Sequence, residues 1–496
     1  MLNIKQPAAT PSRQKYAVRM DRFGKINMSD AEAVMSLEES PEARNIATDD
    51  GRLKRIDGFG WVKWIKDGTE IKLRQLPRTV ENLFEFQATS AQDADYRNFY
   101  FSDSTGDLFK FRYAEESNKI ESSLVNPDDG NEGKPYTYFT QFKCGTDNCA
   151  LLGGPECGPY IYTEDGTYRL ISSTNKPHMS RTAMHYGRMF GVGDPSYPQR
   201  VWFSKLNDPD DFSISDSTGG YIDITDLIGD TIDVFSVFDT LYIFCRYGIA
   251  ALNSLSLQCD FSVENVYYSD SEIINGSISL CGGQILFATR YGVYAFNGSS
   301  VSQISRSVKG FFKDIVCRKE TSVCFNGSYF LSYHKKDGEC GMIVYNLSSG
   351  NFKIFTGADI ISFAIYRGAE NEKLITAFDS SSVVSEWGAG DKVSGAGAIS
   401  ALWRSPKTCL GAPNAEKTIL EAHFTAYGDG DIVFTVNADG HTSSHIITLE
   451  NEEKAYHIPI GVSGHIVNFQ ISNRYGSNFS VSPLMFIYTI QNTGVN

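Results

Sequence analysis

The sequence predicts an all-β protein on three observations: its residue types, its short alternating apolar runs and an internal repeat. Among the 496 residues are 32 Phe, 26 Tyr and 44 Gly. Aromatic residues are enriched in strands, and glycines permit the tight turns that join strands. Because 41% of the residues are hydrophobic, the chain can fill the cores of two or three ordinary domains.

The internal repeat indicates the architecture of the middle of the chain. One segment aligns without gaps on another 44 residues later, and nearly the same step recurs twice more. The four units are residues 239–252, 283–296, 327–333 and 372–378. A strand–turn–strand pattern with a period of about 40 to 50 residues is typical of a β-propeller blade. We therefore expect the units to form successive blades, with Arg246 and Arg290 at equivalent positions.

Looser copies of this unit extend the repeat toward the N-terminus. They lie at residues 97–101, 159–162 and 188–193. Together with the four regular units, they predict a β-propeller of about seven blades over residues 43–390. Residues 43–59 alternate and turn like a hairpin, with Asp50-Gly51 as the turn, and we expect this hairpin to open the propeller.

The segments on either side of the predicted propeller have different sequence patterns. Residues 1–42 are expected to form an N-terminal arm, in which Ser29-Asp30-Ala31-Glu32 is a capping-box pattern for a short helix ending near Glu39. The Gly-rich residues 388–397 suit a linker. Residues 391–496 are expected to form a C-terminal antiparallel β-sandwich, because longer alternating strands occur there. Two apolar faces carry this expectation: Leu420, Ala422, Phe424 and Ala426, and Val467, Phe469 and Ile471.

Charge and targeting signals narrow the range of functions. Lys and Arg number 45 and Asp and Glu 59, which gives a net charge of −14. Tight binding to nucleic acid needs clustered basic residues, so we do not expect it. The N-terminus lacks the apolar stretch of a signal peptide, and no apolar run reaches membrane-spanning length. We expect cytoplasmic synthesis, no membrane span, and ten cysteines that are reduced and mostly buried.

One segment of the predicted propeller carries a family resemblance. Its elements are Gly193-Asp194-Pro195, Arg200-Val201-Trp202-Phe203-Ser204 and Asp208-Pro209-Asp210-Asp211-Phe212, followed by Tyr221-Ile222-Asp223-Ile224 and by residues 232–244. This order resembles propeller proteins of tailed bacteriophages, among them podovirus tail-hub and packaged-DNA stabilisation proteins. The predicted C-terminal sandwich departs from the short-tail stabilisation proteins.

The resemblance implies a structural virion protein, a tail hub, nozzle or head–tail connector that surrounds or closes the DNA channel and helps to retain and deliver packaged DNA. It implies a homo-oligomeric ring with other tail or portal-proximal proteins as partners, past which the genome moves during ejection without tight binding. The expected location is the virion tail, after synthesis in the host cytoplasm. Two alternatives stay open: a tail-tip propeller that binds a host carbohydrate or receptor, and a glycosidase-like propeller enzyme.

The sequence matches known catalytic motifs poorly, and we do not expect the protein to be an enzyme. The nearest match to the Asp-box turn of sialidases is residues 102–109, but Ser104 stands where the motif has Asp and Leu108 where it has Thr. Glycoside hydrolysis needs two carboxylates at a defined separation. Asp223, Asp226 and Asp230 share one turn-rich segment, which a solvated loop explains better.

Candidate metal ligands are equally weak, and we expect no catalytic, cofactor or metal site and no cofactor. The eight histidines are dispersed and show no H-E-x-x-H spacing. Cys144, Cys149 and Cys157 are the one close cysteine group, and unpaired thiols are the favoured interpretation over a metal site. The acidic stretches 208–211 and 428–431 do not match a calcium-binding loop, so we interpret them as turns.

Overall fold

The computed structural model resolves the chain into two compact units, one formed by residues 1–56 with 398–496 and the other by residues 57–397. The structure describes residues 14–66, 69–73, 76–87, 99–114, 119–125, 133–214, 218–225, 228–253, 259, 261–316, 320–367, 372–394 and 397–491. No helix among these residues has the length and apolar character needed to cross a membrane.

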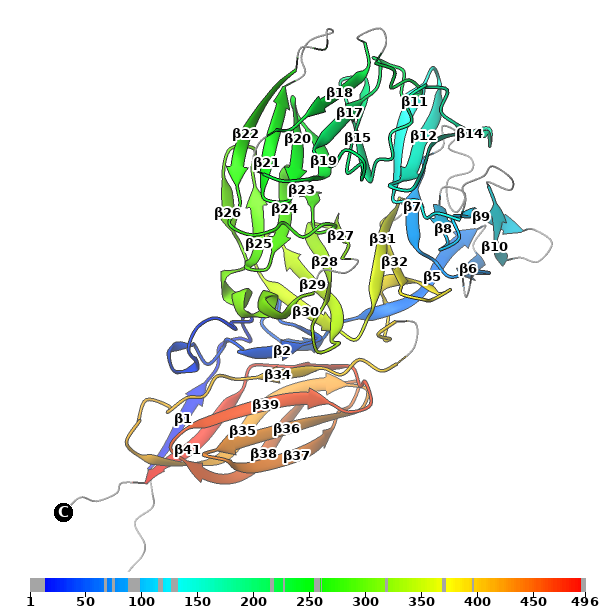
Figure 1. Cartoon of the computed structure of the whole chain (residues 1–496). Coiled ribbons are helices and arrows are strands. Elements are labelled where there is room, and N and C mark those ends of the chain that lie inside the picture. Colours follow the sequence, from blue (N-terminus) through cyan, green and yellow to red (C-terminus); the bar gives the residue numbers. More distant parts are fainter. Residues whose placement is uncertain are drawn as a thin grey trace, which may run out of the picture. The chain divides into compact units, whose positions relative to one another are not determined.

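The unit of residues 57–397 is a seven-bladed β-propeller, because its described strands form seven separate antiparallel sheets (Figure 1). Blade I contains β7 Asn82–Glu85, β8 Phe99–Ser102, β9 Leu108–Ala114 and β10 Lys119–Leu124. Blade II contains β11 Tyr138–Cys144, β12 Asp147–Gly154, β13 Cys157–Thr163 and β14 Tyr168–Leu170. Blade III contains β15 Arg181–His185, β16 Arg188–Val192, β17 Arg200–Phe203 and β18 Gly220–Asp223.

The remaining blades follow the chain in the same way. Blade IV contains β19 Thr231–Val237, β20 Thr240–Cys245, β21 Gly248–Asn253 and β22 Ser262–Tyr268. Blade V contains β23 Ser279–Cys281, β24 Gln284–Thr289, β25 Gly292–Phe296 and β26 Val301–Gln303. Blade VI contains β27 Ser322–Phe325, β28 Ser328–His334, β29 Cys340–Asn346 and β30 Phe352–Thr356. Blade VII contains β31 Ile360–Arg367, β32 Glu372–Phe378, β33 Val384–Gly390, β5 Gly58–Lys66 and β6 Thr69–Leu73.

The repeat prediction is confirmed. The aligned segments 239–252 and 283–296 cover the second and third strands of blades IV and V, and the next two copies cover the second strands β28 and β32. Arg246 and Arg290 both lie in the turn between the second and third strands of their blades. The 44-residue step is therefore the length of one blade.

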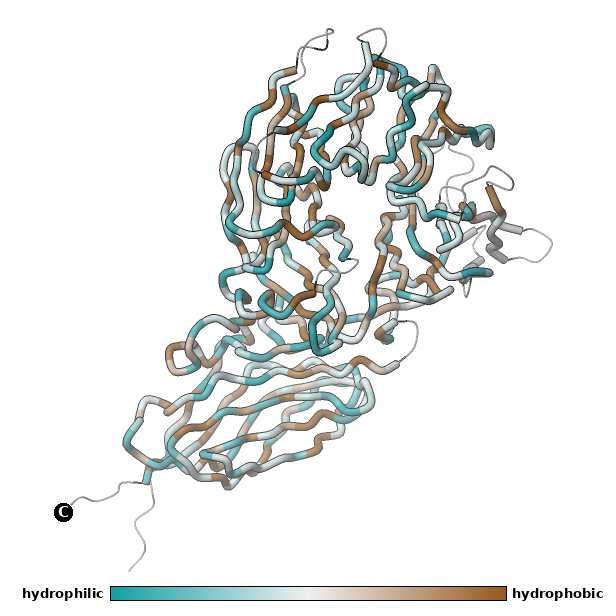
Figure 2. The backbone as a smooth tube through the Cα atoms, in the orientation of Figure 1, coloured by the Kyte–Doolittle hydropathy of each residue, from teal (hydrophilic) through white to brown (hydrophobic). Residues whose placement is uncertain are grey.

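The core of the propeller lies between neighbouring blades. Each apolar cluster draws its side chains from two adjacent sheets, as in the cluster of blades III and IV that joins Phe190 and Phe203 to Ile243 and Leu252. Equivalent clusters join blades I and II, II and III, IV and V, and VII and I. Figure 2 shows hydrophobic and hydrophilic stretches along the strands of this unit. Strands such as β16 and β21 are buried almost throughout, because both faces of their blades pack against neighbours.

The propeller ring closes through β5, which comes from the start of the unit and completes the last blade. It pairs antiparallel with β33, placing Phe59 opposite Trp387, and Figure 1 shows β5, in blue, joining the yellow strands of this blade. The approach is close: a Cβ on Gly60 would lie 2.3 Å from the Ala389 carbonyl oxygen. The first part of the stretch expected to be a linker is thus the end of β33, where glycine allows the two strands to approach.

The second unit is a β-sandwich, and it includes strands from both ends of the chain. One sheet has the order β1-β41-β35-β40-β4-β3, with β38 also paired to β35, and the other has the order β2-β34-β39-β36-β37. The first contains β1 Lys15–Arg19, β3 Ile46–Ala47, β4 Leu53–Arg55, β35 Glu416–Gly428, β38 Lys454–Gly464, β40 Phe479–Val481 and β41 Met485–Gln491. The second contains β2 Glu42–Arg44, β34 Leu402–Arg404, β36 Asp431–Ala438, β37 His441–Thr448 and β39 Val467–Asn473. Aromatic contacts join the sheets, such as Phe469 to Phe486 at 4.9 Å between ring centroids.

The expected domain boundaries therefore need correction at the N-terminus. Residues 1–42 were expected to be an arm and residue 43 the start of the propeller, but the propeller unit begins at residue 57. The reason is long-range pairing: β1 pairs with β41 over five residue pairs, and β2 pairs with β34. The predicted hairpin does form, since β3 pairs with β4 and Gly51 adopts a φ of +78° in the turn, but it belongs to the sandwich.

Two local expectations in this unit were wrong. In place of a helix from Ser29 to Glu39 there is one 3₁₀ turn, Glu32–Val34. The Glu32 carboxylate accepts hydrogen bonds from the Arg404 guanidinium at 2.9 and 3.1 Å, so it does not close a capping box. In β35 a register shift between Ile419 and Glu421 buries Ile419 and leaves Leu420 half-buried, because a bulge moves the alternation by one residue.

Replacing Phe59 by Ala is expected to destabilise the propeller by about 3–5 kcal/mol, the usual cost of removing a buried aromatic ring. Phe59 is fully buried and contacts Phe378 and Trp387 at 5.0 and 5.1 Å between centroids. Denaturant unfolding followed by circular dichroism measures the change. Phe238→Ala is the matched control, because Phe238 is 86% exposed; equal effects of the two changes would contradict this account of ring closure.

Candidate functional site in blade III

The segment that carries the family resemblance forms blade III and the loops on either side of β17. The first loop, between β16 and β17, begins at Gly193, whose φ is +73°. The buried Asp194 carboxylate accepts one hydrogen bond from the Trp202 indole nitrogen at 3.1 Å and one from the Ser196 backbone N–H at 2.9 Å. This carboxylate therefore fastens the loop to the blade core and satisfies a buried indole N–H.

Arg200 links the start of β17 to β18. Its guanidinium donates to both carboxylate oxygens of Asp223, at 2.8 and 3.2 Å. It also lies between two tyrosine rings, 3.5 Å from the centroid of Tyr221 and 4.1 Å from that of Tyr197. The two rings are 39% and 47% exposed, so the arrangement presents an aromatic surface held by a cation–π stack and a bidentate ion pair.

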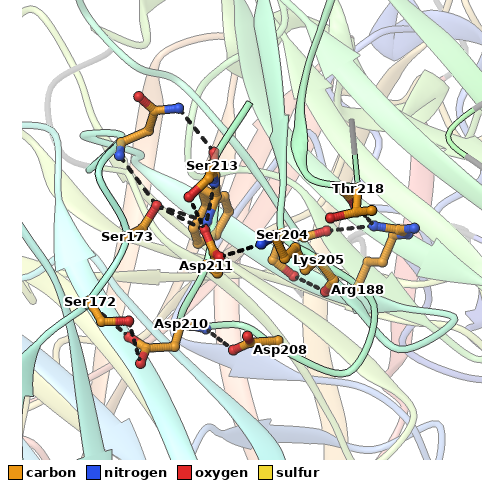
Figure 3. Close-up of polar contacts among 12 residues, drawn as sticks. Ser172, Ser173, Arg188, Ser204, Lys205, Asp208, Asp210, Asp211, Ser213 and Thr218 are labelled. Carbon is orange, nitrogen blue, oxygen red and sulfur yellow. Dashed lines mark hydrogen bonds and ion pairs between the residues drawn. The ribbon is translucent and has the colours of Figure 1, made fainter. Parts of the chain in front are cut away.

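The second loop, between β17 and β18, connects blade III to blade II. Asp211 accepts hydrogen bonds from the Lys205 ammonium, the Ser213 backbone N–H and the Ser173 hydroxyl (Figure 3). Burial opposes ionisation of Asp211, but the hydrogen bonds from Lys205 and Ser213 outweigh it and lower its pKa to about 2. The carboxylate is thus held ionised as the centre of the loop.

Asp210 makes the corresponding connection beside it. Its carboxylate accepts hydrogen bonds from the Ser172 backbone N–H at 2.7 Å and from the Ser172 hydroxyl at 3.0 Å (Figure 3). It also accepts one from the Arg169 guanidinium at 3.0 Å. Ser172 and Arg169 belong to blade II and the loop after it. Asp208 accepts from the Asp210 backbone N–H. The acidic stretch is therefore a turn with cross-blade contacts, as the sequence interpretation held, and its oxygens bind protein donors.

The other candidate carboxylates are not assembled into a catalytic pair among the described residues. Asp223 binds Arg200, whereas Asp230 forms an ion pair with Arg246 at 3.2 Å. Asp226 lies outside the described residues. In the Asp-box-like segment, Asp103 accepts backbone N–H groups of its own turn from Thr105 and Asp107.

The candidate cysteine group converges only in part: the Cys144 and Cys149 thiols lie within hydrogen-bond reach of each other, but Cys157 lies apart from them. Cys149 lies near the start of β12, while Cys157 is paired near the other end of that strand and donates to the Pro135 carbonyl. Five residues of strand separate these positions by about 17 Å. The described cysteines are free, and burial raises the pKa of Cys149 to about 11 and that of Cys157 to about 12. These two thiols are therefore protonated at neutral pH and unsuited to hold a metal together.

The second acidic stretch, residues 428–431 in the sandwich, also makes hydrogen bonds that hold local turns. Asp429 accepts a hydrogen bond from the Asn478 backbone N–H at 2.6 Å, and Asp431 accepts one from the Thr448 hydroxyl at 2.7 Å. The turn interpretation again fits.

The sequence reasoning did not find one group of potential ligands, Glu421, His423 and His457 in the sandwich. The available signal was Glu-x-His in an alternating strand, which places both side chains on one face. The third member could not be recognised, because only the pairing of β35 with β38 brings His457 opposite His423.

Comparisons with known proteins find similarity in the fold alone. No protein-family model matches the sequence, and no curated protein matches it. Among solved structures, the chain resembles an extracellular domain assigned to a one-component system from B. thetaiotaomicron, with 10% identity, a TM-score of 0.44, and coverage of 89% of this chain and 64% of that one. It also resembles the Neurospora crassa Pan2 WD40 domain, with 10% identity, a TM-score of 0.36, and coverage of 63% and 96%.

A third similar structure is a puromycin-hydrolyzing peptidase of Mycobacterium tuberculosis, with 11% identity, a TM-score of 0.39, and coverage of 72% of this chain and 61% of that one. This chain therefore spans less than two thirds of the length of that protein and of the B. thetaiotaomicron domain. At these identities the similarities concern the fold alone and carry no activity over to this chain.

Replacing Asp194 by Ala is expected to destabilise the propeller by about 1–3 kcal/mol, because it leaves the buried Trp202 N–H without its acceptor. Asp208→Ala is the matched control: Asp208 is exposed, and a change of about 0.5 kcal/mol or less is expected. Denaturant midpoints of the purified variants test the difference. Equal midpoints for the Asp194 variant and the unaltered chain would show that this hydrogen bond does not hold the loop.

Proposed function

We propose that the chain is a structural protein of a tailed-bacteriophage virion, located at the tail hub, the nozzle or the head–tail junction, where it surrounds or closes the DNA channel. The proposal begins from the resemblance of residues 188–244 to tailed-phage propeller proteins. The observation that carries it further is the use of that segment's polar side chains: Asp194, Arg200, Asp210 and Asp211 each bind groups of this chain. These side chains hold loops in place and link neighbouring blades. Such a structural role is what we expect of a subunit in a larger assembly.

A non-enzymatic role is favoured by the same contacts. A general acid or nucleophile must face the substrate in an open site. Here the candidate carboxylates Asp223 and Asp230 are engaged by different arginines. The net charge of −14 is compatible with a component past which DNA slides without a salt-sensitive complex.

A second candidate function is recognition of a host carbohydrate at the tail tip, and one observation favours it. Tyr197 and Tyr221 are both partly exposed and flank Arg200. Aromatic rings held in a fixed orientation offer apolar faces at low conformational cost, which sugar rings can contact. Position along the tail separates this candidate from the first.

Antibody labelling in the electron microscope tests both candidates. Gold-labelled antibodies against the purified chain are applied to particles released by the bacterium that carries the gene, with antibodies pre-absorbed on the pure chain as the control. Label at the tail hub, nozzle or head–tail junction is the expected result, and label confined to the distal tip would favour recognition. Particles without specific label would contradict a virion role altogether.

A further inference from the structure

The sandwich carries a group of three metal-ligating side chains on the outer face of two paired strands. Glu421 and His423 lie two residues apart on β35, and His457 lies directly opposite His423 on β38. The Glu421 Oε2 atom is 3.1 Å from the Nε2 atom of each histidine. The two imidazole rings stack, with centroids 4.6 Å apart and planes at 12°.

These distances suit a small divalent cation. Zn²⁺ holds nitrogen and oxygen ligands at about 2.0–2.2 Å, so two ligand atoms at neighbouring corners of its tetrahedron lie about 3.3–3.6 Å apart. Each Glu421–histidine distance is close to that value. All three ligand atoms lie within 4.8 Å of one another, so rotations of two exposed or half-exposed side chains, His457 and His423, bring the nitrogens into range.

The ligand types favour a late first-row transition metal. Two imidazoles and one carboxylate are a donor set that Zn²⁺ uses in proteins when it keeps one coordination position open. The open coordination position can face a groove of about 410 Å³, which His423 and His457 line together with Arg19, Pro483 and Met485. Water or an anionic group in the groove can complete the coordination.

Two basic residues act against a cation here and make the site testable. The Lys15 ammonium lies 3.9 Å from Glu421 Oε1, the oxygen that does not contact the histidines, and its side chain is 63% exposed. Arg19 lines the groove. Lys15 can move away from the carboxylate at small cost, but its charge reduces the affinity of the site for any cation.

We propose that Glu421, His423 and His457 form a Zn²⁺-type metal site that ties β38 to β35. The β38 strand pairs with β35 alone among the described strands, so a metal bridge would fasten one edge of the sheet. The site is independent of the virion role, because it follows from the geometry of the sandwich.

Calorimetric titration of the full chain with ZnCl₂ tests the site, in a Cys144→Ser background because Cys144 is an exposed free thiol. One ion per chain is expected. His457→Ala and Glu421→Gln should each weaken binding by about 10-fold or more, since a lost ligand costs at least as much as a lost partner of a ligand. His441→Ala is the matched control, an exposed histidine of the same unit that should leave affinity unchanged.

Two further measurements make the outcome decisive. Lys15→Gln should bind Zn²⁺ more tightly than the unaltered chain, at an unchanged stoichiometry of one ion per chain, because it removes a positive charge beside Glu421. Hydrogen exchange should show slower exchange of β38 amides when Zn²⁺ is present, and no such slowing in the His457→Ala variant. Absence of saturable binding, or equal affinity in the His457→Ala and His441→Ala variants, would overturn the proposal.

Discussion

The pairing of β5 with β33 is the constraint on which the propeller depends. Apolar clusters join neighbouring blades around the ring, so an open ring would expose two apolar blade faces to water. Closure by a strand from the start of the unit removes both ends at once. The close approach of Gly60 to the Ala389 carbonyl and the burial of Phe59 against Trp387 show how local sequence makes this pairing possible.

Long-range strand pairing also builds the sandwich, and it explains why the N-terminal segment is divided at residue 57. The strands before that residue pair with the C-terminal part of the chain, as Lys15 with Thr489, whereas the strand after it completes blade VII. N-terminal strands thus complete both units: β5 closes the propeller ring, whereas β1, β2 and β3 lie at edges of the sandwich sheets.

The sequence was most informative where contacts are local. The 44-residue step predicted blades IV to VII because each unit repeats one strand–turn–strand pattern, and the alternation of Val467, Phe469 and Ile471 predicted a buried face that the structure contains. The partners of the N-terminal strands were not predictable in this way. Pairing between segments as distant as Ala43 and Trp403, or Lys15 and Thr489, leaves no periodic signal in either segment.

The remaining differences have equally specific causes. Glu32 has the spacing of a capping box, but Arg404 on a distant strand takes its carboxylate. The bulge at Leu420 interrupts an alternation that reads as continuous in the sequence. At the candidate sites, the turn roles of Asp208 and Asp211 followed from Pro and Asp chemistry, whereas the contact of His423 with His457 depends on strand register.

Native-state hydrogen exchange of the full chain with increasing denaturant tests the division at residue 57 most directly, because it resolves which segments unfold together. We expect the amides of β5 to lose protection from exchange at the same denaturant concentration as those of β31 to β33. The amides of β1 and β2 should lose protection together with those of β34, β35 and β41. Exchange of β1 to β5 together as one N-terminal segment, ahead of both sets of partners, would contradict this account.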